Sequence, residues 1–251
     1  MSSRSLWILR VTLVAALSVV PALAGPVLIS AYPWGSNSDT AIMDAVFGAG
    51  NYTVYDSFAA ATPGTIFTPG TNFVWLEGGS GTDVDWNSYV TSNAATILSW
   101  VNAGGRLLLM SAGSSTQTTT LGPGALTFDG SNYYACGTLT AAGVAAFPTT
   151  AASQCGNYLA HDSVTGSGLT AFMESGATAI LAGTGYGAGY IMYSGLTDYQ
   201  WHYNGSSLLE NVVAFTAGDI AAVPEPGTAT MLGAGLLLAA AGLIRRQRNR
   251  A

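Results

Sequence analysis

Short apolar runs alternate with amphipathic stretches through the middle of the chain. The runs Val27–Ser30, Phe73–Leu76 and Arg106–Met110 hold almost no polar residue between their ends, which predicts strands buried on both faces. Tyr52–Tyr55, Ala177–Ala182 and Gly189–Tyr193 are the other predicted strands. Apolar residues at helical spacing predict helices over Asp39–Phe47, about Trp86–Asn102 and about Ser206–Thr216.

The order of these elements predicts the fold class. It reads β-α-β-β-α-β, then an insertion over about residues 114–160, then β-β-α. Continuous apolar strands separated by helices are typical of parallel sheets that helices cover on both faces. We therefore expect residues 25–222 to form one α/β domain, a three-layer flavodoxin-like fold with a mostly parallel sheet.

The N-terminal residues 1–24 have the pattern of a secretory signal peptide. Arg4 and Arg10 lie before the apolar stretch that starts at Val11, and Pro21 ends that stretch. Ala22 and Ala24 place small residues three and one positions before the expected cleavage point. The pattern predicts export and cleavage after Ala24.

The C-terminal residues 223–251 combine three elements. An extended motif comes first (Val223, Pro224, Glu225, Pro226), then the uncharged segment 228–244, then a basic tail over 245–251 (Arg245, Arg246, Arg248, Arg250). As a helix, the 17 residues of the apolar segment would be about 25 Å long, which is short but sufficient for a transmembrane helix. The arginines would then stay on the cytoplasmic side. An ordinary membrane anchor is the alternative.

This C-terminal arrangement resembles the PEP-CTERM sorting signal of Gram-negative bacteria, with Pro224-Glu225-Pro226 as its motif. The resemblance covers the last 29 residues and implies recognition by an exosortase-type processing enzyme, followed by loss of the tail. It implies a precursor anchored transiently in the inner membrane and a product in the periplasm, at the cell surface or in an exopolysaccharide matrix.

The charge of residues 25–222 differs from that of the whole chain. The sequence has no lysine, and six of its seven arginines lie in the two terminal segments, so Arg106 alone remains in the middle. With 12 acids in the same part, the exported domain carries a net charge of about −11. This excludes nucleic acid as a partner, because phosphate binding needs Lys or Arg.

Two cysteines, Cys136 and Cys155, lie 19 residues apart within the insertion. In an exported protein such a pair predicts a disulfide. A metal site is less favoured, because two cysteines without nearby histidines do not complete a tetrahedron.

The middle of the chain also resembles class I glutamine amidotransferase-like domains. The similar segments are Phe73–Gly79, Trp100–Leu109 and His161–Leu169, the last spaced like a "His-Pro-hydrophobic-Thr-x-Gly-Leu" turn. The family's catalytic Cys would stand after the fourth strand, where this chain has Ser111, and its His-x-Glu would follow Tyr193, where the chain has Ser-Gly-Leu. The resemblance therefore implies the fold without the amidotransferase activity.

Four residues are the candidates for another catalytic site. Ser111, His202 and Asp198 are a nucleophile, a base and an acid at the expected carboxyl edge of the sheet, and Glu77 is a candidate general base there. The alternatives are that Ser111 caps a turn, that His202 packs on its aromatic neighbours, and that Glu77 binds loop amides.

The loop before the second long helix offers carboxylates for a cation. Asp83 and Asp85 are candidate Ca²⁺ ligands, although Ca²⁺ prefers six to eight oxygens and an Asp at the position of Asp85 is more often a helix N-cap. Otherwise we expect no cofactor. The aromatic segment 198–203 is suited to stacking on sugar rings or to a protein contact, or to covering the sheet edge.

Taken together, these patterns predict an exported protein at the cell surface or in the exopolysaccharide matrix, with a noncatalytic structural or binding role. The rival hypothesis is an exported hydrolase that works through Ser111 or Glu77 with His202.

Overall fold

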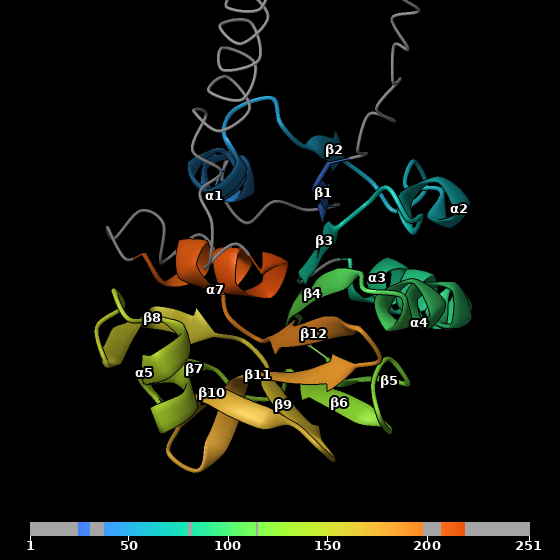
Figure 1. Ribbon diagram of the computed structural model, residues 1–251. Coiled ribbons are helices and arrows are strands. Elements are labelled where there is room, and N and C mark those ends of the chain that lie inside the picture. The colour runs from blue at the N-terminus through green and yellow to red at the C-terminus, as the bar shows by residue number, and fades with distance from the viewer. Residues whose placement is uncertain (1–24, 31–37, 80–81, 114, 198–206, 219–251) are drawn as a thin grey trace, which may run out of the picture.

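The computed structural model describes residues 25–30, 38–79, 82–113, 115–197 and 207–218 of the chain (Figure 1). The predicted signal peptide, with Ala22 and Ala24, and the predicted sorting tail lie outside the described residues. So do Asp198 and His202.

Two sheets form within the described residues. The larger has the strand order β2-β1-β3-β4-β12-β11-β10-β7-β8, and the smaller has the order β5-β6-β9. The strands are β1 (Val27–Ser30), β2 (Thr53–Tyr55), β3 (Phe73–Gly79), β4 (Arg106–Ala112), β5 (Gln117–Thr119), β6 (Leu126–Asp129), β7 (Tyr134–Leu139), β8 (Ser153–Ala160), β9 (Ser163–Gly166), β10 (Thr170–Ser175), β11 (Thr178–Tyr186) and β12 (Gly189–Ser194). The helices are α1 (Ser38–Phe47), α2 (Pro63–Ile66), α3 (Asp83–Ser92), α4 (Ala94–Asn102), α5 (Ala141–Ala146) and α7 (Leu208–Ala217).

The prediction of a mostly parallel, flavodoxin-like sheet is wrong. Strands β2, β1, β3, β4 and β12 pair in parallel, but from β12 to β8 every pairing is antiparallel. The small sheet is antiparallel as well, so six of the ten pairings between described strands are antiparallel. The fold is a mixed, strand-rich one, and the likeness to amidotransferase-like domains does not hold.

The cause lies in the predicted insertion. Its residues form β7 and β8, which extend the main sheet through β10 instead of lying outside it. Antiparallel strands need no crossover connection, and in this second half of the sheet β10, β11 and β12 follow one another through short turns.

The described helices also bear on the predicted membrane span. None of them is long and apolar enough to cross a bilayer. The segment 228–244, on which that prediction rested, lies outside the described residues.

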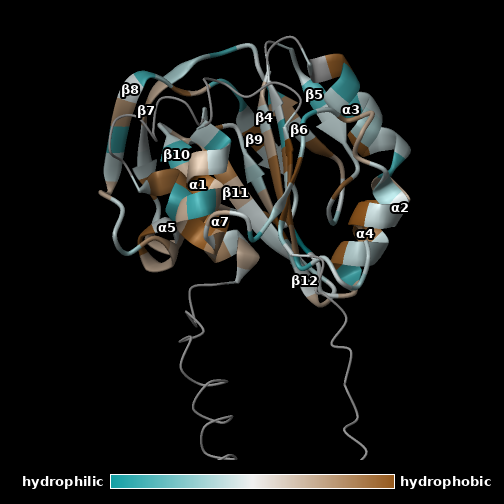
Figure 2. Ribbon diagram, turned by 90° about the horizontal axis from the view of Figure 1, so that it is seen from above, coloured by the Kyte–Doolittle hydropathy of each residue, from teal (hydrophilic) through white to brown (hydrophobic). Residues whose placement is uncertain are grey.

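Each face of the main sheet is covered by its own hydrophobic cluster (Figure 2). Helices α1 and α7 cover one face, where Met43 and Val212 pack with Leu108 of β4. Helices α3 and α4 and the small sheet cover the other face, where Trp86 and Phe128 pack with Leu109. Alternate residues of β4 thus enter different clusters, as the two-residue period of a strand requires.

The helix predicted over Trp86–Asn102 is divided into α3 and α4. Asn93 lies between them, and its side-chain Nδ2 donates a hydrogen bond to the Tyr89 carbonyl at 2.8 Å. This bond caps a carbonyl of α3 locally, which is how an Asn side chain competes with a continuing helix.

Both ends of the described fold lie at the amino edge of the parallel strands. Gly25 lies two residues before the start of β1, and Gly218 lies beside the Arg106 side chain at the start of β4. Arg106 also donates through a guanidinium nitrogen to the Thr216 carbonyl at 3.3 Å, which places a cation at the last turn of α7.

Candidate functional site

The carboxyl ends of the parallel strands bring buried polar residues together. Ser30 ends β1, Glu77 lies near the end of β3, Ser111 near the end of β4, and Ser194 ends β12. All four are buried, with exposed fractions of 6% or less. Since parallel strands point the same way, their ends meet at one edge, as the sequence predicted for Glu77 and Ser111.

Glu77 is tied to its neighbouring strand. The Ser30 hydroxyl donates a hydrogen bond of 2.5 Å to a Glu77 carboxylate oxygen, and the two residues are register partners in β1 and β3. Glu77 is 1% exposed. A carboxylate held this way between buried strands has a structural partner and little access to a substrate.

Ser111 faces the opposite side of the sheet from Glu77. In the register of β3 and β4, Glu77 pairs with Met110, and Gly78 pairs with Ser111. Met110 belongs to the cluster under α1 and α7, whereas Leu109 belongs to the cluster under α3 and α4. Because side chains alternate along a strand, Ser111 points toward the second cluster and Glu77 toward the first.

His161 and Asp162 reach this edge from the end of β8. A carboxylate oxygen of Asp162 accepts from the Gly113 amide at 3.1 Å, directly after β4. The backbone amide of His161 donates to the Gly195 carbonyl at 2.9 Å, which joins this turn to the end of β12. Asp162 thus helps to close the connection after β4, where the sequence predicted an active-site turn.

Burial lowers the pKa of the His161 imidazole below its usual value of 6.5. The Ala112 carbonyl, 3.4 Å from Nδ1, acts in the opposite direction. Loss of hydration has the larger effect of the two. It disfavours the charged imidazolium, so the neutral form of His161 is favoured at neutral pH.

The structure leaves the other predicted site residues untested or without a metal-binding group. His202 and Asp198 lie outside the described residues, as does the aromatic segment around them. Asp85 is exposed on α3, and no group of three or more acids, histidines or cysteines suited to a metal occurs within the described ranges. The side chain of Asp83 is not among those described.

The predicted disulfide is confirmed. Cys136 and Cys155 are register partners in β7 and β8, with Cα atoms 4.1 Å apart, and both are exposed. The bond ties together the two strands that end the main sheet on this side.

An aromatic cluster stands beside the disulfide-bonded strands. Tyr133 precedes β7, Tyr158 lies in β8, and both pack edge-to-face on the His161 ring, with ring centroids 4.8 and 5.5 Å from it. The two tyrosines also contact each other at 5.4 Å. They nevertheless remain 60% and 46% exposed, and so present large ring surfaces to solvent near the carboxyl end of β4.

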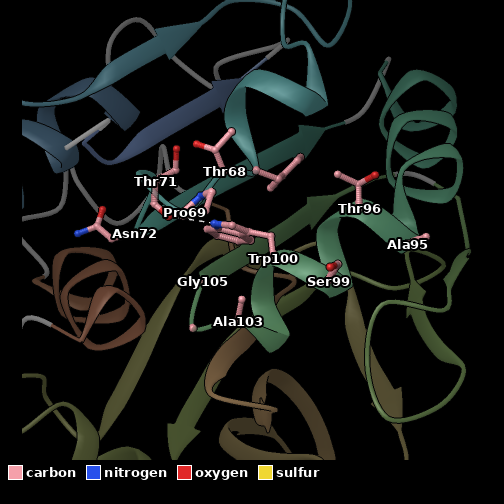
Figure 3. A pocket seen from close by; sticks show the side chains of 12 residues that line it. Thr68, Pro69, Thr71, Asn72, Ala95, Thr96, Ser99, Trp100, Ala103 and Gly105 are labelled. Carbon is pink, nitrogen blue, oxygen red and sulfur yellow. Dashed lines mark hydrogen bonds between the residues drawn. The ribbon is translucent and has the colours of Figure 1, made fainter. Parts of the chain in front are cut away.

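A cavity of about 640 Å³ opens at the opposite, amino edge (Figure 3). Trp100 of α4 forms one wall, and its Nε1 donates to the Thr71 carbonyl at 2.9 Å. Thr68, Asn72, Thr96 and Ser99 add neutral polar groups, and no charged residue lines the cavity. It therefore holds no residue that would serve as an acid, a base or a metal ligand.

Sequence reasoning missed Ser30, Asp162, Tyr133 and Tyr158. Ser30 lies 47 residues from Glu77, and only the strand order brings the two together. The tyrosines had one usable signal, because each lies three residues from a predicted disulfide cysteine.

No protein-family model and no curated protein matches this chain. Among solved structures, a cytoplasmic protein from Salmonella typhimurium LT2 is 12% identical, over 78% of this chain and 99% of its own, with a TM-score of 0.49. A second cytoplasmic protein from Salmonella typhimurium is 9% identical, over 78% and 98%, also at 0.49. A β-galactosidase from Rahnella sp. R3 is 11% identical over 77% of this chain but 30% of its own, at 0.40. With TM-scores below 0.5, these likenesses assign no function.

Proposed function

We propose that this chain is an exported bacterial protein, sorted through its PEP-CTERM-like terminus, that works at the cell surface or in an exopolysaccharide matrix. Its role there is noncatalytic, either structural or in binding. An exosortase-type enzyme is the proposed processing partner.

The observation that carries this proposal is the disulfide between Cys136 and Cys155. Both sulfurs lie on exposed residues of opposed strands, where a reducing cytosol would have free access to them. Disulfides of this kind persist in oxidising compartments outside the cytosol. The bond is therefore consistent with the export and sorting signals that residues 1–24 and 223–226 predict.

The positions of Ser111 and Glu77 support a noncatalytic role. They point to opposite faces of the sheet, so their side chains do not converge on one point. Glu77 is also buried and bonded to Ser30. The rival hydrolase, which would work through Ser111 or Glu77 with His202, would be inactivated by Ser111→Ala or by Glu77→Gln.

Mass spectrometry of protein recovered from the cell surface tests the export proposal. We expect a form that lacks residues 1–24 and the basic tail Arg245–Arg250. A Pro224→Ala/Pro226→Ala variant should retain its tail and stay with the cell. A Ser88→Ala variant, whose change is far from both terminal signals in the sequence, is the control and should be processed like the wild type. Intact arginines on the released wild-type protein would refute the proposal.

A further inference from the structure

The aromatic cluster of Tyr133, Tyr158 and His161 has features that a buried core does not need. Within the described residues, five large apolar side chains are markedly exposed, and two of them are these tyrosines. Exposed valines on separate elements account for the others, Val54, Val84 and Val144. The cluster is thus the one place in the described structure where such exposed side chains contact each other.

We propose that the Tyr133–Tyr158 pair is a binding site for an uncharged polysaccharide, whose sugar rings stack on the exposed tyrosine faces. This inference rests on the proposed matrix-associated function and names the ligand class and the site. A tyrosine ring offers an electron-rich face to the C–H bonds of a sugar and a hydroxyl to the sugar's own hydroxyls.

The site is held in place before any ligand arrives. Tyr133 directly precedes β7 and Tyr158 lies in β8, and the Cys136–Cys155 bond joins these strands. His161 supports both rings from beneath. Because the rings are already fixed by these contacts, binding costs little side-chain entropy, and this favours the weak individual contacts that sugars make.

The surroundings of the tyrosines are polar but carry no positive charge. Asn132 and Asn157 adjoin them in the chain and are exposed, so the segments that carry the two rings are polar. Asp129 is four residues before Tyr133 in the chain, and its carboxylate accepts from the Ser131 hydroxyl and amide at 2.6 and 3.1 Å. A negative charge in this segment disfavours an acidic polysaccharide.

The net negative charge of the whole domain also favours an uncharged polysaccharide over an anionic one. Arg106, the one Arg or Lys in residues 25–222, lies at the amino edge, where it binds the end of α7. An anionic chain would therefore find no cation near the tyrosines. A protein partner is also disfavoured. The cores of protein interfaces are usually rich in several aromatic residues together with Met and Arg. Here the two tyrosines have asparagines as neighbours in the chain instead.

The test measures binding of the full, oxidised chain to neutral β-1,4-glucan, β-1,4-mannan and β-1,3-glucan hexasaccharides by titration calorimetry. Polygalacturonate serves as the charged counterpart. We expect binding to at least one neutral hexasaccharide and none to polygalacturonate. Tyr133→Ala and Tyr158→Ala should each weaken binding about tenfold, while Tyr133→Phe and Tyr158→Phe should keep most of it because they keep the ring.

Val144→Ala is the matched control, since Val144 is 50% exposed on α5 and lies outside the cluster. Each variant is checked for an unchanged unfolding midpoint. Binding that survives the double alanine variant would overturn the site, as would a preference for polygalacturonate. Absence of binding to every neutral hexasaccharide would overturn the ligand class, while export and tail removal are judged separately by the mass of the released protein.

Discussion

At the scale of single residues, His161 makes the stability of the fold depend on pH. Burial lowers its pKa below 6.5, so in acid the unfolded chain takes up a proton that the folded chain resists. The stabilisation from neutral His161 is complete above about pH 6.5 and is lost as the pH falls toward the lowered pKa. We expect the free energy of unfolding to fall between pH 7.5 and 5.0, and to fall less in His161→Gln.

Urea unfolding of both proteins at the two pH values measures this difference. The acids, including neighbouring Asp162, are common to both chains and cancel in the comparison. An equal pH dependence of wild type and variant would show that His161 is not the titrating group.

Ser30 provides a second test at this scale. Its hydroxyl donates to the buried Glu77 carboxylate, so Ser30→Ala removes a donor that water cannot easily replace. We expect a loss of about 1–3 kcal/mol in the free energy of unfolding. Ser88→Ala on the exposed side of α3 is the control and should change little, and a Ser30→Ala protein as stable as that control would contradict the interpretation.

At the scale of elements, the disulfide holds β7 to β8 at the end of the main sheet. It closes a loop of 19 residues, for which the chain-entropy estimate is about 3 kcal/mol. We therefore expect a Cys136→Ser/Cys155→Ser variant to unfold at lower urea, with a loss near that size. Reductant should lower the wild-type midpoint and leave the variant unchanged; a wild-type protein indifferent to reduction would count against this role.

The same elements show what the sequence could predict. The apolar runs of β1, β3 and β4 were correctly predicted as strands because both of their faces are buried. The segments of β7 and β8 carry exposed residues on consecutive positions, for example Asn157-Tyr158, and so lack the clean alternation that indicates a strand. Without them the extension of the antiparallel half through β7 and β8 could not be foreseen, although the β11–β12 hairpin could.

The candidate site was predictable only in part, for a related reason. A polar residue at the end of an apolar run predicts an edge position, and this is where Glu77 and Ser111 lie. Which face each residue occupies depends on the pairing register, because one position along a strand reverses the side. The opposite orientation of Glu77 and Ser111 is a property of that register.

At the scale of the whole molecule, the exported part carries about 12 acids against a single arginine. Such a net charge opposes the compact state by self-repulsion, which salt screens. We expect the melting temperature of the released form to rise when NaCl is raised from about 0.01 M to about 0.15 M, where the Debye length falls to about 8 Å. Calorimetry measures this shift, with KCl as a control that should act equally; a lower melting temperature in salt would contradict it.

The position of the two ends of the described domain decides how that domain is oriented on a support that holds it there. Gly25 and Gly218 both lie at the amino edge, whereas Tyr133 and Tyr158 lie near the carboxyl end of β4. A domain held directly at Gly25 or at Gly218 therefore turns the Trp100 cavity toward its support and the tyrosines toward the medium. A sensor chip that captures a tag placed directly at either of these residues would leave the tyrosines accessible and would hide the cavity.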